Sequence, residues 1–297
     1  MKKFLFILLI LLPFFVDAKE TITIIYGFSA SDNFANYGRT LAEESNRIQN
    51  KYNFVFDVKP GGGQTIAVNY VTNTKNTVFQ TGSAYWVRPL FYPQESYDVY
   101  SLRTIMTQCE VPFGIASVRY PNWESVPQDR PLTIGTPGVG VVGELIAIEI
   151  QKRYPNLTLI PYKSTTESIV ATVGGQVDFT IGFPADLERF NQSHSLQILG
   201  ITGTNSSRYK LLSQQGFDKN LENMNSRSSI MVPVSWSKTK TIEIRSILIK
   251  AEQSQSVRNS YALDYCIPFQ IPEKQLETWQ NQQNAIWTQM VKRIRKD

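Results

Sequence analysis

The spacing of hydrophobic and polar positions predicts alternating strands and helices along the chain. Short apolar runs at 21–26, 52–58 and 76–80 have the length of buried strands, and residues at helical spacing between Phe34 and Ile48 follow the first run. Ser31 stands where a helix N-cap is expected. Strands separated by helices are typical of a parallel α/β sheet, so we expect the chain to begin with one.

A second set of strands and helices is predicted after the proline-rich stretch from Pro121 to Pro131, where we expect the chain to cross between domains. The strands are expected at 132–135, 157–160, 177–181 and 196–201. Helices are expected at about 142–153, after the capping pair Ser164 and Glu167, from about Lys238 and from Glu273, with a return crossing at 229–234. This pattern predicts one domain from 19–119 plus 236–297 and another from 120–235.

The first eighteen residues have the pattern of a secretion signal. Lys2 and Lys3 precede an apolar run at 4–16 that is too short for a stable membrane span, and Val16-Asp17-Ala18 resembles a cleavage site. We predict a signal peptide at 1–18, cleavage after Ala18, and a mature protein in the periplasm. No later segment has the length and hydrophobicity of a membrane span.

The low numbers of histidine and cysteine restrict the kinds of metal site that the chain could form. One histidine, His194, cannot build a multi-histidine metal centre, and two cysteines cannot form a zinc ribbon, so we predict no metal and no cofactor. Cys109 and Cys266 could pair in an oxidising compartment, but the sequence leaves their pairing open. The formal charge of +5 is scattered, which fits a small anion better than nucleic acid.

The segment from Gly138 to Gly143 matches the G-x-G-x-x-G spacing between a predicted strand and helix, yet no acidic residue ends the next strand, as dinucleotide binding would require. Two interpretations remain. Backbone N–H groups at the helix start, beside Thr136, could hold a carboxylate or phosphate, or the glycines could form a tight turn only. Similarly, 60–65 lacks the Lys-Ser/Thr ending of a phosphate loop and predicts a glycine turn.

The turn at 27–31 approaches the nucleophile elbow of hydrolases, and Ser29, Asp178 or Asp186, and His194 occur in the order of a triad. However, His194 lies in a polar stretch, 191–195, that predicts a surface turn, whereas a triad requires a histidine held by its neighbours. We therefore predict that the protein is not an enzyme. The serines are better interpreted as a helix cap and as hydroxyl donors to a ligand.

Several short blocks occur in one order along nearly the whole mature chain. They are Pro60 to Gly63, the turn from Thr133 to Gly138, Gly143-Glu144, Pro161-Tyr162-Lys163, Gly174 to Asp178, Leu196 to Thr202, and Met231-Val232-Pro233. Together they resemble the extracytoplasmic solute-binding receptors of tripartite tricarboxylate transporters, the Bug family. Three departures stand out: serines replace glycines in the first loop, Ser164 replaces the glycine after Lys163, and "GTP" replaces the usual serine-rich turn.

The resemblance implies an α/β, two-domain, periplasmic binding protein-like (type II) fold, in which each domain is a mostly parallel sheet flanked by helices and the ligand cleft lies between domains. It implies capture of a small organic anion, such as a di- or tricarboxylate, an aromatic acid or an acidic amino acid, and delivery to membrane transporter subunits by a monomer. The implied ligand contacts are Phe28, Ser29, Ser31, Asp32, Asn33, Thr81 and Ser83 on the first domain and Thr136, Gly138, Val139, Gly140, Tyr162, Lys163, Phe183 and Asp186 on the second.

Some alternatives stay open at this point. Asp32 could hold an amino group of the ligand or help to start its helix. Lys163 could attract a carboxylate or be a solvated residue at the rim. The same fold could also serve a sensing module with a different membrane partner.

Overall fold

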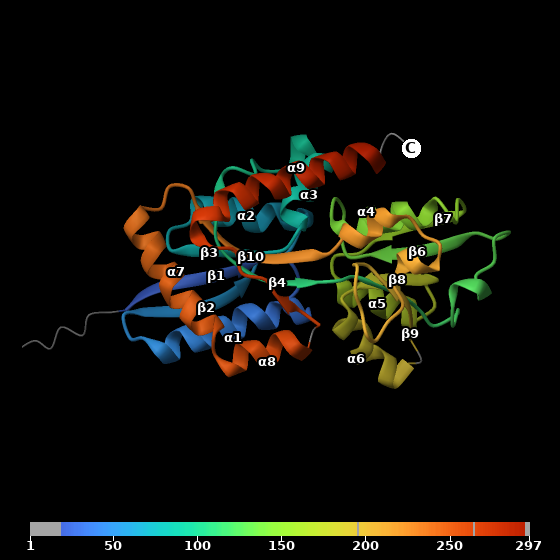
Figure 1. Cartoon of the computed structure of the whole chain (residues 1–297), viewed down its shortest axis with the longest axis horizontal. Coiled ribbons are helices and arrows are strands. Elements are labelled where there is room, and N and C mark those ends of the chain that lie inside the picture. The colour runs from blue at the N-terminus through green and yellow to red at the C-terminus, as the bar shows by residue number, and fades with distance from the viewer. Residues whose placement is uncertain (1–18, 195, 264, 295–297) are drawn as a thin grey trace, which may run out of the picture.

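The computed structural model describes residues 19–194, 196–263 and 265–294. The predicted signal peptide and its cleavage site lie outside the described residues. Two β-sheets, each with helices on its faces, lie end to end along the long axis of the molecule (Figure 1). We call the part built on the sheet that contains the N-terminal strand the first lobe, and the other part the second lobe.

The first lobe contains a six-stranded sheet in the order β11-β4-β10-β3-β1-β2. Its strands are β1 (Glu20–Tyr26), β2 (Tyr52–Val58), β3 (Thr77–Thr81), β4 (Leu102–Val111), β10 (Ser226–Pro233) and β11 (Ile267–Pro268). β1 lies between β2 and β3 and is parallel to both, whereas β10 runs antiparallel to β3 and β4.

Helices cover both faces of the first sheet, so that the consecutive residues Ile24, Ile25 and Tyr26 of β1 are all buried. These helices are α1 (Asn33–Ile48), α2 (Thr65–Asn73), α3 (Ala84–Phe91), α7 (Lys238–Glu252), α8 (Gln255–Leu263) and α9 (Leu276–Ile294). Ile24 packs in one cluster with residues of α1 and α7, while its neighbour Ile25 packs in another with residues of α2, α3 and α9. Successive side chains of a strand point to opposite faces, so one strand contributes to both layers.

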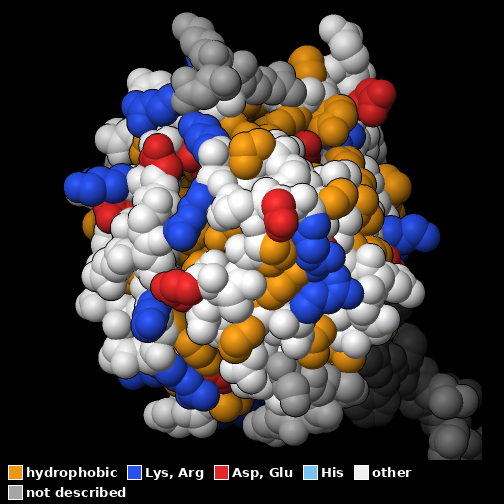
Figure 2. Space-filling view, turned by 90° about the vertical axis from the view of Figure 1, so that its right-hand side faces the viewer, with side chains coloured by type: hydrophobic (Ala, Val, Ile, Leu, Met, Phe, Trp, Pro, Cys, Tyr) orange, Lys and Arg blue, Asp and Glu red, His pale blue; other side chains and the backbone are white. Residues whose placement is uncertain are grey.

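The second lobe repeats this plan with five strands in the order β7-β6-β8-β5-β9. Its elements are β5 (Gly114–Ser117), β6 (Leu132–Thr136), α4 (Val142–Gln151), β7 (Leu157–Pro161), α5 (Thr165–Val173), β8 (Phe179–Gly182), α6 (Pro184–His194) and β9 (Gln197–Ile201). In each sheet the strand that enters from the other lobe runs antiparallel to both of its neighbours, β10 in the first and β5 in the second. The short β11 of the first sheet is also antiparallel to its neighbour β4. The outer face of the second lobe mixes basic, acidic and hydrophobic side chains (Figure 2).

The chain passes between the sheets at 112–113, after β4, and at 224–225, before β10. The predicted boundaries at 119/120 and 235/236 lie several residues later, which placed β5 and β10 in the wrong sheets. The proline-rich stretch from Pro121 to Pro131 is a connection within the second lobe, between β5 and β6. Proline breaks regular structure in any surface connection, so its abundance does not by itself mark an interdomain linker.

The predicted helix ends agree with the structure at α5 and differ from it at α1 and α6. Ser164 caps α5 as predicted, because its Oγ accepts a hydrogen bond from the N–H of Glu167 at 3.2 Å. At α1, however, the N-cap is Asp32 and not Ser31. The predicted surface turn at 191–195 was also wrong as far as His194, because α6 continues through that residue.

The longest strand, β4, was not predicted at all. Its polar residues Thr104, Thr107 and Gln108 are buried, so the strand shows no alternation of apolar and polar positions. A side chain of β4 also forms the one covalent crosslink among the described residues: Cys109 pairs with Cys266 in a disulfide whose Cα atoms are 5.4 Å apart. In the part of the chain that the structure describes, no helix combines the length and hydrophobicity that crossing a membrane requires.

Candidate functional site

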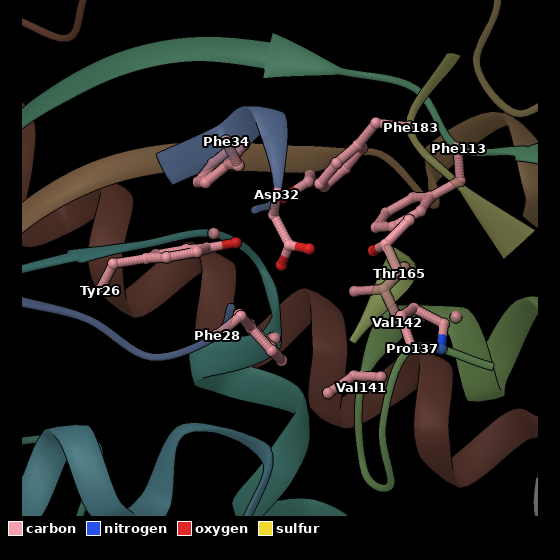
Figure 3. A pocket seen from close by; sticks show the side chains of 14 residues that line it. Tyr26, Phe28, Asp32, Phe34, Phe113, Pro137, Val141, Val142, Thr165 and Phe183 are labelled. Atoms are coloured by element: carbon pink, nitrogen blue, oxygen red, sulfur yellow. The ribbon is translucent and has the colours of Figure 1, made fainter. Parts of the chain in front are cut away.

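A narrow cavity of about 40 Å³ lies between the two lobes, where the carboxyl ends of β1 and β3 face those of β6 and β8 (Figure 3). Fourteen residues from both lobes line it: Tyr26, Phe28, Asp32, Phe34, Gly82, Ala84, Phe113, Pro137, Val141, Val142, Gly143, Thr165, Phe183 and Ser226. Loops at the carboxyl ends of parallel strands are the usual place for a ligand in α/β proteins.

Aromatic rings form much of the wall and join the lobes. Phe34 from the first lobe stacks on Phe183 from the second, with ring centroids 5.4 Å apart, and Phe183 also lies 4.8 Å from Phe113. Tyr26 lies against Phe34 at 5.8 Å on the opposite side. Because rings from the two lobes are in contact, the structure shows the cavity with its lobes closed.

Asp32 brings a carboxyl group into this apolar setting. Its side chain points into the middle of the cavity in Figure 3, and the residue is 3% exposed. Although Asp32 is the N-cap of α1, its side chain makes no capping hydrogen bond. Its Oδ1 accepts a hydrogen bond from Thr166 Oγ1 at 3.4 Å. Burial raises the pKa of this carboxyl group to about 7, against the lowering effect of that hydrogen bond and of Arg189.

One other acidic residue near the cavity, Asp186, is paired with a cation. Asp186 is completely buried at the start of α6, and its Oδ1 lies 3.4 Å from Arg189 Nη2. Burial, and then the charges of Asp32 and Asp186, raise the pKa of Tyr26 well above its ordinary value. None of the fourteen lining residues is a lysine or an arginine.

The turn between β6 and α4 approaches the cavity with its backbone. Gly138 and Gly140 have φ of +128° and +67°, a region that favours glycine. The N–H of Gly138 donates to the carbonyl of Thr136 at 2.9 Å, and that of Gly140 donates to Glu144 Oε2 at 2.5 Å. Some of the N–H groups predicted to hold an anion therefore have partners within the turn.

The first residues of α4 also lie at the cavity wall. Val142 and Gly143 both line the cavity, and N–H groups in the first turn of a helix have no acceptor within that helix. A Cβ atom on Gly143 would lie 2.7 Å from Pro137 Cδ, so this position requires glycine for the helix start to pack against the turn. The start of α4 is thus the part of the second lobe best suited to an anionic group.

Direct hydrogen bonds hold the lobes together beside the cavity. Ser31 Oγ donates to Thr166 Oγ1 at 3.2 Å, and Arg88 Nη1 donates to the carbonyl of Val139 at 3.2 Å. Because Thr166 donates in turn to Asp32, the first-lobe turn and α5 share a chain of hydrogen bonds.

The structure brings only part of the predicted contact set to the cavity. Phe28, Asp32 and Phe183 line it, and Ser31 and Val139 bridge the lobes nearby. The side chain of Asn33 lies outside the described residues. The remaining predicted contacts are Ser29, Thr81, Ser83, Thr136, Gly138, Gly140, Tyr162, Lys163 and Asp186, and none of them is among the lining residues.

Several predicted contacts have structural roles. Thr81 Oγ1 donates to Gln64 Oε1 at 2.7 Å, and Ser83 Oγ donates to the carbonyl of Asn225 at 3.0 Å. Both hydroxyls therefore bind neighbouring segments of the protein. Lys163 is exposed and does not reach the cavity. Conversely, Tyr26, Phe34 and Phe113 were missed as lining residues, because in the sequence an aromatic residue beside a turn resembles any core residue.

Two of the groups considered for a hydrolase triad, Ser29 and Asp178, have other partners in the structure. Ser29 Oγ lies 2.8 Å from Ser31 Oγ, and Asp178 is engaged by Arg119, by Arg130 and by the backbone N–H of Thr133. The side chain of His194 lies outside the described part.

Comparison with solved structures shows which proteins share this fold. The periplasmic binding protein BugD matches with a TM-score of 0.83 and 18% identity, over 93% of this chain and 98% of that one. An R. palustris protein solved with adipate matches with a TM-score of 0.81 and 16% identity, over 93% and 97%.

MatC from Rhodopseudomonas palustris, solved with bound malate, matches with a TM-score of 0.75 and 13% identity, over 92% and 99%. No family model and no curated protein matches the sequence. At these identities the comparison establishes the fold: the chain has the two-domain α/β fold of periplasmic binding proteins.

Proposed function

We propose that the protein is a periplasmic solute-binding receptor of the Bug family, which captures a small carboxylate-bearing metabolite between its lobes and delivers it to a tripartite tricarboxylate-type membrane transporter. The observation that carries this proposal is the interlobe cavity, because residues from both lobes line it at the carboxyl ends of their strands. We propose binding without a catalytic step.

The start of α4 is our candidate for holding the carboxylate. The N–H groups of Val142 and Gly143 lie in the first helical turn at the cavity wall, where the positive end of the helix dipole favours an anion. The neighbours solved with adipate and with malate support a carboxylate as the ligand class.

Closure of the lobes would couple binding to delivery. Only two crossings, at 112–113 and 224–225, join the sheets within the described chain, so they are the natural hinge. A solute that contacts both lobes stabilises the closed state relative to the open one, and a transporter can then distinguish loaded from empty receptor by shape. The disulfide between Cys109 and Cys266 suits the oxidising periplasm that the predicted signal peptide indicates.

A thermal-shift series tests this function. We expect the melting temperature of the purified protein to rise with the concentration of at least one carboxylate-bearing solute from a series that contains adipate, malate and neutral amino acids, because a ligand that binds only the folded state stabilises it by mass action. Adipamide, which has the shape of adipate without its charges, should give no shift.

Two matched variants locate the binding. Ala84→Phe places a ring at the cavity wall and should abolish the shift, whereas Ala285→Phe makes the same change on the exposed face of α9 and should preserve it. Absence of a shift with every carboxylate-bearing solute tested, amino acids included, would overturn the proposed function. An equal shift in Ala84→Phe would place the binding site elsewhere.

A further inference from the structure

Asp32 is the feature of the cavity that a simple carboxylate ligand leaves unexplained. Its side chain is buried, points into the cavity and faces no lysine or arginine among the lining residues. A dicarboxylate placed there would bring a second negative charge against an ionised Asp32 in surroundings of low dielectric constant, where like charges repel strongly.

Helix capping does not account for this acid. Three N-cap side chains elsewhere in the described chain perform that role: Ser164 accepts from the N–H of Glu167, Ser237 from that of Lys240, and Asp218 from that of Asn220. Asp32 occupies the same position at α1, but its side chain makes no capping hydrogen bond. Its carboxyl group accepts a hydrogen bond from Thr166 Oγ1 at 3.4 Å and points into the cavity, as Figure 3 shows.

The surroundings of the carboxyl group suit a cation. Five aromatic residues line the same cavity, namely Tyr26, Phe28, Phe34, Phe113 and Phe183. The faces of aromatic rings attract ammonium groups, and an acid among such rings adds a directional acceptor. An organic amine would satisfy both the charge of Asp32 and the apolar wall.

We propose that the solute is a zwitterion with an apolar body, whose ammonium group binds Asp32 among the aromatic rings while its carboxylate binds the start of α4. This inference rests on the proposed function, which assigns the carboxylate to α4, and adds the class of solute. The two charged ends would then bind to different lobes, so that only a closed receptor contacts both.

The protonation of Asp32 gives the inference an independent signature. Burial raises the pKa of this carboxyl group to about 7, and the charged or titratable groups that act on the site are Arg189 and Asp186 from α6 and Tyr26 from β1. Only the ionised form of Asp32 attracts an ammonium group. Affinity for the zwitterion should therefore rise about tenfold between about pH 6 and about pH 8, while affinity for an amine-free carboxylate should fall or stay constant.

Isothermal titration calorimetry with matched pairs tests the solute class. Each pair consists of an amino acid and the same acid without its amine: 6-aminohexanoate and hexanoate, L-leucine and 4-methylpentanoate, L-phenylalanine and 3-phenylpropionate. Adipate, with a second carboxylate, serves as the anionic comparison. We expect at least one amino acid to bind about 10- to 100-fold more tightly than its amine-free partner.

The outcomes separate the two proposals. If amine-free acids or adipate bind as tightly as the amino acids, the inference is overturned and the proposed function stands. If no compound in the series binds, both are overturned. Binding of phenethylamine as tight as that of L-phenylalanine would keep the role of Asp32 in holding the amine but overturn the carboxylate site at α4, and with it the zwitterion.

A variant pair assigns the effect to one side chain. Asp32→Asn should remove the preference for the amino acid and its pH dependence, whereas Asp129→Asn, the same charge change at an exposed position of the second lobe, should leave both unchanged. Preference retained in Asp32→Asn would overturn the inference. If that variant does not fold, the pH dependence of binding in the unmodified protein decides: affinity for the amino acid that falls as the pH rises would contradict it.

Discussion

The two turns that face each other across the cavity start their helices in opposite ways. At the β1–α1 turn the N-cap side chain, Asp32, leaves the helix uncapped and enters the cavity. At the β6–α4 turn the acid of the first helical turn, Glu144, folds back onto the N–H of Gly140 at 2.5 Å. Glu144 thus forms a hydrogen bond within its own turn, whereas the carboxyl group of Asp32 points into the space between the lobes.

Because of this difference, the two sides of the cavity favour opposite charges. The first lobe contributes an acidic side chain among aromatic rings, and the second contributes the positive end of a helix dipole through Val142 and Gly143. A solute bound between them is oriented by charge as well as by shape. The following predictions change one turn at a time, so that each asks whether the two turns really differ as the structure indicates.

The largest expected effect is on stability in the absence of solute. Because burial raises the pKa of Asp32 to about 7, the folded protein keeps a proton that the unfolded chain loses at about pH 4. Wild-type stability therefore falls as the pH rises through this window. Asp32→Asn should be more stable than wild type by on the order of 3 kcal/mol at about pH 8 and nearly equal to it at about pH 4, by urea unfolding.

Glu252 provides the matched control for this prediction. Burial also raises its pKa to about 7, but its carboxylate accepts hydrogen bonds from Tyr261 and Gln270 and lies outside the cavity. Glu252→Gln should change the pH dependence of unfolding and leave solute affinity unchanged. Equal stability of Asp32→Asn and wild type at about pH 8 would show that the buried carboxylate costs nothing.

Substitution of a glycine in the second turn should have the next largest effect. Gly140 has φ of +67°, and a Cβ there would lie 2.9 Å from both Arg88 Cδ and Tyr92 Cδ2. Gly140→Ala should therefore lose about 2 kcal/mol or more in urea unfolding, from backbone strain plus the clash. Gly175→Ala isolates the strain, since that glycine has φ of +73° with nothing within 4 Å, and should lose about 1 kcal/mol. Equal losses would mean that the turn is not tightly packed against α3.

A smaller effect is expected from the acid that closes the second turn. Glu144→Gln keeps an oxygen acceptor for the N–H of Gly140 but removes the charge at the start of α4. We expect a loss of about 0.5–1 kcal/mol in the free energy of unfolding and no change in the pH profile of solute binding. If that profile shifts, Glu144 and not Asp32 is the acid that the solute meets.

The smallest effect should come from the hydrogen bond between the lobes. Ser31→Ala removes the donor to Thr166 Oγ1 at 3.2 Å, at an exposed position. Solute affinity measured by calorimetry should fall by about two- to fivefold, because the closed state loses one exposed hydrogen bond. Ser256→Ala, which removes a serine hydroxyl bonded to Glu44 at the far side of α1, should leave affinity unchanged. An unchanged affinity in Ser31→Ala would show that this hydrogen bond does not stabilise the closed state.

The amino-acid sequence by itself determined the local structure of this protein. The strand at 52–58 has the predicted bounds, and α5 begins at its predicted cap, because a run of apolar residues or a single hydroxyl decides those features within a few positions. The family resemblance in the sequence also named Phe28 and Asp32 as ligand contacts; both line the cavity, and their contact with a ligand stays a prediction.

Only the tertiary structure decided the features that depend on distant residues. The pairing of Cys109 with Cys266, the exchange of β5 and β10 between the sheets, and the contact of Phe34 with Phe183 each join positions far apart along the chain. Whether Asp32 caps its helix or faces a ligand was open in the sequence for the same reason. The carboxyl group of Asp32 accepts a hydrogen bond from Thr166, which belongs to the other lobe, so its surroundings depend on how the two lobes pack together.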